Sequence, residues 1–452
     1  MKKEHAREIS GLVEKRRDEW DAASDRIWEF AEIRFEERMS SSLLADIFKN
    51  HGFDVECGVA GLETAFVASW GKGGPVIGFL GEYDALPGLS QKAGAVVHDP
   101  VTPGGQGHGC GHNLLGVGAA AAAVAARDYL QAHHLPGTVR YFGCPAEEGG
   151  GGKVLMAKAG VFDGVDAALT WHPASAYFVQ SSRSLASQAV FFHFHGRSAH
   201  AAMNPEVGRS ALDAVELTNI GANYLREHIP QDARLHYAIT DAGGLAPNVV
   251  QARATVRYQL RSPTMREVDE IYPRLCDVAR GAALMTGTRL EIEEGVRYAS
   301  VIPNVTIESL AQENLEVLGV PSTEVGDHEF ARALRATFSE EEKHGNDAPE
   351  TDGLDLAEKL PAYRPNAPLW YASTDVGDVS CIVPTLQYRS AVWAVGTSAH
   401  SWQAVAQGQC AFAHRGMRHA AKVLAATAVD LFQNPDILCA AKQELREALQ
   451  KG

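Results

Sequence analysis

The chain has 452 residues, of which 45% are hydrophobic and 21% charged, and its 41 basic and 56 acidic residues give a formal net charge of −15. This length exceeds what one compact core supports, so two or three domains are expected. The acidic balance argues against a nucleic-acid partner, and no apolar run is long enough to cross a membrane. The first residues, MKKEHAREIS, lack the apolar segment of a signal peptide, so we expect a cytoplasmic protein.

The first part of the chain predicts helices and then a buried strand. Apolar residues recur at helical spacing over residues 5–50, and short alternating stretches near 53–55 and 65–68 predict strands. Residues 76–80 (VIGFL) form a continuous apolar run, which is typical of a buried parallel strand. Acidic residues, Asp84 among them, follow where this strand ends.

Residues 107–113 (GHGCGHN) concentrate side chains that bind metals. The thiol of Cys110 and the imidazole of His112 stand among glycines, which permit a tight turn. A thiolate and an imidazole suit zinc or a similar divalent ion. The alternative is a tight turn with a buried cysteine. A disulfide framework is not indicated, because the seven cysteines are odd in number and scattered.

Two further strands are predicted to end in polar residues of the same kind. Residues 138–144 lead into Glu147 and Glu148, and residues 167–170 lead into His172. The alternation of strands and helices implies a mostly parallel sheet, and ligand sites of such sheets form along the carboxyl ends of the strands. These side chains are therefore expected to lie close to the Cys/His turn.

Residues 187–303 predict an inserted domain. Their elements follow the order β-α-β-β-α-β, which is the ferredoxin-like pattern. The expected strands are 188–195, 235–239, 252–260 and 289–293, and the expected helices lie near 206–228 and 265–285. The flanking parts, residues 1–186 and 304–452, are expected to form one catalytic domain.

The last part of the chain predicts one more ligand. Residues 340–368 are polar and predict a loop, and residues 386–388 predict a short strand. The stretch GTSAHSW then places His400 before a predicted long amphipathic helix over 403–432. A mixed sulfur, nitrogen and oxygen ligand set for two divalent cations follows from five residues, namely Cys110, His112, Glu148, His172 and His400.

Several motifs together carry a resemblance that covers nearly the whole chain: GEYDALPGLSQKAG, GHGCGHNLLG, CPAEEGGGGK, LTWHP, GRSALDAV, ASTDVGDVS and GTSAHSWQ. With them the chain resembles the aminoacylase/carboxypeptidase-G superfamily of dinuclear metallohydrolases, in its amidohydrolase branch with a Cys-Gly-His motif. The resemblance implies an α/β catalytic domain with a mostly parallel sheet and two metals. It also implies that the inserted ferredoxin-like α+β domain serves as a lid and for dimerisation.

The resemblance also implies roles for individual residues. Cys110 would bridge two metal ions, with His112, Glu148, His172 and His400 completing the ligand set. Glu147 would be the general base, able to take a proton from a metal-activated water. His200, in the inserted domain, would stabilise the oxyanion in the active site of a partner subunit. Asn248 would be a polar residue on the substrate side.

One position departs from the carboxypeptidase branch, which has a metal-binding histidine where this chain has Glu82. A metal role for Glu82 is therefore not expected, His112 is the replacement, and Asp84 is expected to orient a ligand. An acidic chain that binds an anionic substrate also needs an arginine near the site, for which Arg183 and Arg261 are candidates by position.

The expected reaction is metal-dependent hydrolysis of the amide bond of an N-acyl amino acid, with p-aminobenzoyl-glutamate as the leading substrate. The alternatives on the same site are another N-acyl amino acid such as indole-acetyl-aspartate, a dipeptide, or an aromatic amine lost by deamination. A non-catalytic regulatory subunit is a further alternative. Zinc and manganese are both compatible with the ligands. A homodimer, or a hetero-oligomer with a related subunit, is the expected assembly.

Overall fold

The computed structural model describes residues 4–344 and 348–451, which form two compact units. The first unit contains the described residues of Met1–Ser182, Ile302–Pro368 and Val379–Lys451. The second contains Arg183–Val301 and Leu369–Asp378. Among the described residues, no helix has the length and apolar character needed to span a membrane.

A seven-stranded sheet forms the centre of the first unit, in the order β1-β2-β4-β3-β5-β13-β6. Its strands are β1 (Asp54–Cys57), β2 (Phe66–Lys72), β3 (Val76–Glu82), β4 (Gly137–Cys144), β5 (Ala167–Ala174), β6 (Phe178–Gln180) and β13 (Thr385–Ala391). The four inner strands, β4, β3, β5 and β13, are parallel, and the outer pairings are antiparallel. The predicted α/β class is confirmed, with a parallel centre inside a mixed sheet.

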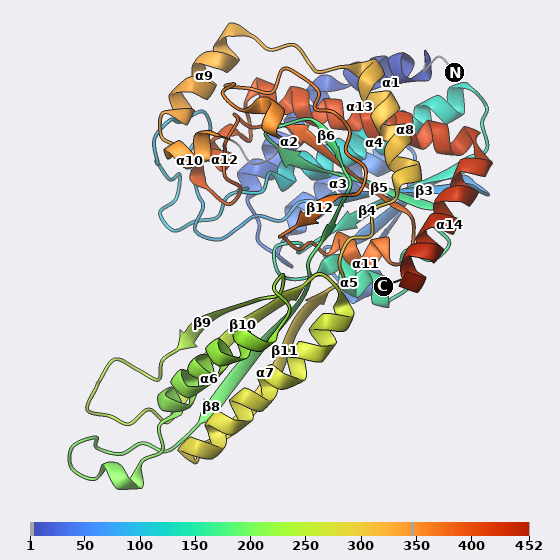
Figure 1. Cartoon of the computed structure of the whole chain (residues 1–452). Helices are drawn as coiled ribbons and strands as arrows, with labels where there is room; N and C mark the ends of the chain where they lie inside the picture. The colour runs from blue at the N-terminus through green and yellow to red at the C-terminus, as the bar shows by residue number, and fades with distance from the viewer. Residues whose placement is uncertain (1–3, 345–347, 452) are drawn as a thin grey trace. The chain divides into compact units, whose positions relative to one another are not determined.

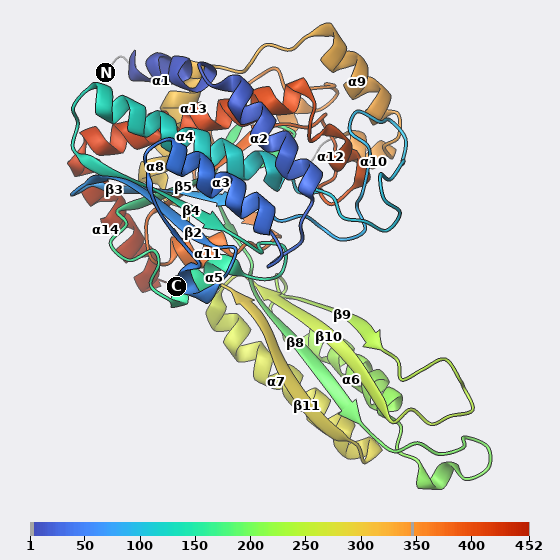
Figure 2. The same cartoon turned by 180° about the vertical axis from the view of Figure 1, so that it is seen from behind.

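Helices cover both faces of this sheet (Figures 1 and 2). The larger core lies against α1 (Glu4–Glu14), α2 (Arg17–Phe30), α3 (Arg38–Asn50), α4 (His112–Ala132), α8 (Val305–Leu318) and α13 (Ala411–Gln433). A smaller core on the other face includes residues of α5 (Gly152–Lys158) and α11 (Val376–Ser380). The other elements outside the second unit's sheet are α9 (Val325–Arg335), α10 (Glu340–Lys343), α12 (Trp402–Gln407) and α14 (Pro435–Lys451), with β7 (Ser182–Ser184) and β12 (Ala367–Trp370) where the chain passes between units.

Helix α4 packs directly on the sheet and begins at His112. Its run of alanines favours a helix and leaves a narrow, fully apolar surface. At Gly116 an added Cβ would lie 2.5 Å from the backbone oxygen of Glu82, so only glycine permits this approach to the end of β3. The close packing places the first turn of α4 beside the carboxyl ends of the parallel strands.

The predicted long helix over 403–432 is wrong, because the chain forms two helices, α12 and α13. The break lies at Gly408, where an added Cβ would come within 2.5 Å of the Trp28 ring. Cys410 then caps α13, since its Sγ accepts a hydrogen bond from the backbone nitrogen of Ala413 at 3.4 Å. A contact with a distant tryptophan, which the local periodicity does not record, coincides with the break.

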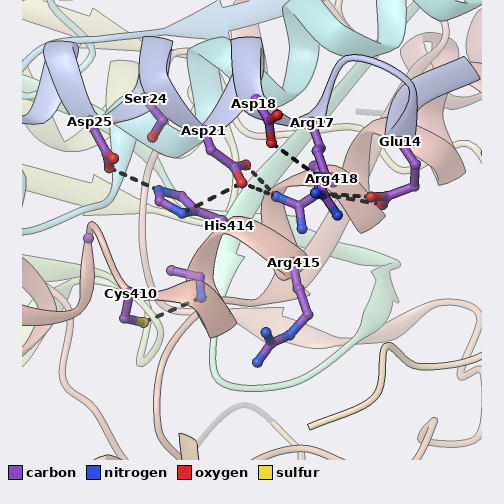
Figure 3. Close-up of polar contacts among 12 residues, drawn as sticks. Glu14, Arg17, Asp18, Asp21, Ser24, Asp25, Cys410, His414, Arg415 and Arg418 are labelled. Carbon is purple, nitrogen blue, oxygen red and sulfur yellow. Dashed lines mark hydrogen bonds and ion pairs between the residues drawn. The ribbon is translucent and has the colours of Figure 1, made fainter. Parts of the chain in front are cut away.

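Ion pairs join the N-terminal helices to α13 (Figure 3). Arg418 contacts Asp21 on α2 and Glu14 at the end of α1. His414 Nε2 lies 2.9 Å from Asp25 Oδ1, one turn along α2. These contacts fix the start of the chain on a helix that lies near its end.

The second unit has the predicted ferredoxin-like order. Its elements are β8 (Ala186–His195), α6 (Ala211–Leu225), β9 (Arg234–Asp241), β10 (Arg253–Ser262), α7 (Met265–Thr286) and β11 (Arg289–Tyr298). They form an antiparallel sheet of order β11-β8-β10-β9, with both helices in one apolar core. Helix α6 begins later than the predicted 206, because Ser210 caps it by accepting from the backbone nitrogen of Asp213 at 3.0 Å.

Candidate metal centre

Three groups of ligand-type atoms lie together in the first unit. In each group the ligand atoms are within 4.8 Å of one another. The groups are Cys110 with His112 and His172, Cys110 with Glu148 and His400, and Glu82 with His112 and Glu147. The chain thus brings together all five predicted ligands and the predicted base, and Cys110 belongs to two of the groups.

His172 faces Cys110 from the end of β5. Its Nε2 lies 3.3 Å from Cys110 Sγ, and its Nδ1 lies 2.8 Å from the carbonyl oxygen of Pro173. Donation from Nδ1 to that carbonyl leaves the Nε2 lone pair directed at the thiol. Burial, together with the nearby charge of Arg389, holds the pKa of His172 well below its usual value, so the ring is a neutral ligand.

His112 is oriented by Asp84. Nδ1 of His112 lies 2.9 Å from Asp84 Oδ1, and both side chains are completely buried. Burial alone would lower the pKa of His112, but the charges of Cys110 and Asp84 raise it well above its usual value. The surroundings of this imidazole are therefore strongly negative, which favours a cation.

Glu148 and His400 form the more exposed side of the centre. The backbone nitrogen of Glu148 donates to Asp84 Oδ2 at 2.8 Å, and Glu148 Oε1 lies 3.3 Å from His400 Nε2. Hydrogen bonding to Cys110 and Glu148 raises the pKa of His400 to about 10. His400 has a φ of 61°, a backbone conformation that non-glycine residues rarely adopt and that is concentrated at functional sites.

Two buried ligand atoms have no hydrogen bond although they have close neighbours. His112 Nε2 lies 3.2 Å from Glu82 Oε2, and Glu148 Oε1 lies near His400, yet neither contact has hydrogen-bonding geometry. Buried polar atoms are nearly always satisfied, so each such atom needs an explanation. A divalent cation would satisfy both, and thiolate, imidazole and carboxylate ligands fit zinc or manganese.

The sequence analysis missed a residue that contacts this centre. Lys153, fully buried in the first turn of α5, places its Nζ 2.6 Å from Glu82 Oε1. The only sequence signal is its position five residues after the Glu147–Glu148 pair. Glu82 itself, for which no metal role was expected, lies among the ligand-type atoms of one group.

A segment before α3 also contacts the centre. Arg34 Nη1 donates to the backbone oxygen of Glu148 at 3.2 Å and lies on the exposed side. Its neighbour Phe35 has a φ of 63°, and the backbone nitrogen of Ala85 donates to the oxygen of Glu32 at 2.7 Å. The segment is therefore held against the residues that follow β3, with an arginine beside a predicted ligand.

The remaining predicted residues lie in the second unit, so their roles stay predictions. His200 Nδ1 accepts hydrogen bonds from the backbone nitrogens of Ala202 and Met203 at 3.2 and 3.1 Å, which leaves Nε2 as the proton donor. Arg261 donates to Ser373 at 2.6 Å. Asn248 is exposed and Arg183 half-buried.

The parallel strand ends, the shared thiol and the adjacent carboxylates define a hydrolase of the metallopeptidase type. Residues 78–365 match Peptidase family M20/M25/M40, and the chain belongs to this family.

Individual relatives agree with this assignment. The chain is 45% identical to one of the named subunits of p-aminobenzoyl-glutamate hydrolase from Escherichia coli, over 96% of this chain and 94% of that protein. It is 31% identical to the Xaa-Arg dipeptidase of Mus musculus, over 95% and 89%. A dinuclear metal-binding peptidase of the M20 family from Bacillus subtilis shares the fold with a TM-score of 0.58 at 16% identity, over 93% and 99% of the two chains.

Proposed function

We propose that this protein hydrolyses the amide bond of an N-acyl amino acid, with p-aminobenzoyl-glutamate as the leading substrate. The observation that carries the proposal is the sharing of Cys110 between two groups of ligand-type atoms beside Glu147. The similarity to the p-aminobenzoyl-glutamate hydrolase of Escherichia coli supports the choice of substrate.

Cys110, His112 and His172 would hold one divalent cation, and Cys110, Glu148 and His400 a second. When bound, two such cations polarise the amide carbonyl and make water more acidic. Zinc and manganese both fit these ligands, and we propose one of them as the resident metal.

Glu147 would move the proton that the reaction requires. It follows the end of β4 directly before Glu148, so one carboxylate can bind metal while the other faces the substrate. Glu147 would take a proton from the attacking water and transfer it to the leaving amine. His200 would donate its Nε2 proton to the oxyanion, since backbone amides occupy Nδ1.

We propose a dimer formed through the second unit. Strand β9 is an edge strand with mostly exposed residues, among them Tyr237 and Ile239, and such an edge can pair with another sheet. The Escherichia coli relative carries the name of one subunit of its enzyme, so a hetero-oligomer with a related chain is the second arrangement. A cytoplasmic location belongs to the same proposal, because free thiols such as Cys110 persist in reducing compartments.

The test is hydrolysis by the purified protein after loading with zinc or manganese. Release of p-aminobenzoate and glutamate from p-aminobenzoyl-glutamate is the expected result. The panel also contains indole-acetyl-aspartate and dipeptides ending in arginine, because of the likeness to an Xaa-Arg dipeptidase. A protein that binds two metals and cleaves none of these compounds would be a non-catalytic subunit, and the proposal would be rejected.

A further inference from the structure

A buried ion pair lies beside the metal groups and has no role in the proposed chemistry so far. Lys153 is 0% exposed and Glu82 2% exposed, and Lys153 Nζ lies 2.6 Å from Glu82 Oε1. The other oxygen of Glu82 lies 3.2 Å from His112 Nε2, the atom that would bind metal. Glu82 therefore stands between a lysine ammonium and a predicted metal ligand.

The surroundings of Glu82 contain several other anionic groups. A Glu147 oxygen lies within 4.8 Å of the grouped atoms of Glu82 and His112, and Cys110 lies within the same distance of His112. Like charges at such distances repel strongly in a buried site. Lys153 supplies a buried positive charge here, and it comes from α5, directly after the glycine loop that follows Glu148.

We propose that Lys153 is a positioning residue that acts through Glu82. By holding Oε1 of Glu82, it keeps this carboxylate off the metal ions, so that His112 Nε2 is the ligand at that position. It also fixes the start of α5 to the end of β3, and thereby the position of the loop that carries Glu147. This inference rests on the proposed metal site and deepens it.

Loss of the lysine charge alone has a different expected effect from loss of both charges. In Lys153→Met the side chain keeps its length, but Glu82 is left without its ammonium partner. Removing one member of a buried pair is strongly disruptive, whereas replacing both is often neutral. The double variant Glu82→Gln/Lys153→Met therefore separates a charge effect from a packing effect.

The experiment compares both variants with the unaltered protein by two measurements. The first is the visible spectrum after loading with cobalt(II), which reports the ligands around the metal without any need for activity. The second is kcat and KM for p-aminobenzoyl-glutamate, with thermal unfolding as the control for folding.

Lys153→Met is expected to change the cobalt spectrum and to lower kcat by ~10-fold or more, the scale of effect known for residues that orient metal ligands, with KM nearly unchanged. The double variant is expected to regain the spectrum and most of kcat. If Lys153→Met does not fold, recovery in the double variant supports the proposal equally. An unchanged spectrum in Lys153→Met, or a double variant as impaired as the single one, overturns it. Should the unaltered protein fail to cleave the substrate, the spectra still test the role of Lys153 alone.

Discussion

Asp84 Oδ1 lies 2.9 Å from His112 Nδ1, and both side chains are completely buried. The contact orients the imidazole and, with the proton on Nδ1, leaves Nε2 to bind metal. The other oxygen of Asp84 accepts from the backbone nitrogen of Glu148 at 2.8 Å. One carboxylate thus positions a residue from each of the two Cys110-containing groups.

Replacing Asp84 with Asn is expected to weaken metal binding by roughly 10–100-fold, because the imidazole loses its anionic partner. Calorimetric titration of the metal-free protein with zinc or manganese measures the effect. Asp99→Asn is the matched control, since Asp99 pairs with Lys92 in a separate, partly exposed contact. Equal affinities for the two variants would contradict the role of Asp84.

Replacing Cys110 with Ala is expected to reduce the metal content from two ions per chain to one or none. The reason is that the thiol belongs to two of the three groups. Metal analysis after dialysis gives the stoichiometry, and Cys57→Ala, at an exposed cysteine, is the control. Retention of two ions would show that Cys110 does not bridge.

Replacing Glu147 with Gln preserves shape but removes the proton acceptor, so kcat should fall by ~10²-fold or more while both metals stay bound. The comparison is Glu148→Gln, which should lose metal because Glu148 is the proposed ligand of the pair. Steady-state kinetics and metal analysis on the same samples decide. Metal loss in Glu147→Gln with retention in Glu148→Gln would reverse the two roles.

Arg34 is expected to bind a carboxylate of the substrate, because its guanidinium lies at the backbone of Glu148 on the exposed side of the centre. Arg34→Ala should raise KM for p-aminobenzoyl-glutamate by about 10-fold, the scale of one charged hydrogen bond. It should have little effect on the side-chain amide of that substrate. Arg38→Ala, which removes an exposed partner of Glu63, is the control. An equal rise for both substrates would remove Arg34 from recognition.

His200 is expected to act in the active site of the partner subunit. Mixing inactive His200→Ala chains with inactive Glu147→Gln chains should then restore activity, because mixed dimers contain one site with both residues intact. Subunit exchange is followed with two different affinity tags. Exchange without recovered activity would place His200 in the site of its own subunit or outside catalysis.

The fold was largely predictable because its signals are local. The apolar strand β3 and the alternation of elements predict a parallel centre, and parallel strands necessarily bring Asp84, Glu148 and His172 to one edge. In the second unit, the order of elements alone indicated the ferredoxin-like sheet.

The missing parts depend on contacts between distant residues. Lys153 resembles any lysine in a short helix until Glu82 is found beside it. Arg34 lies far from Glu148 in sequence, and Gly408 ends a helix against Trp28 from the opposite end of the chain. Periodicity reports which face of an element is buried, but it does not report which residue lies opposite.

The placement of His400 after the second unit has a consequence for the order in which the metal centre can be assembled. Cys110, His112 and His172 all precede the insertion, so a nascent chain carries this group complete before the second unit has been made. The other group has to wait for His400, after the whole insertion has emerged from the ribosome. One cation site therefore depends on contacts of short range along the chain, and the other on the slower closure of a very long loop.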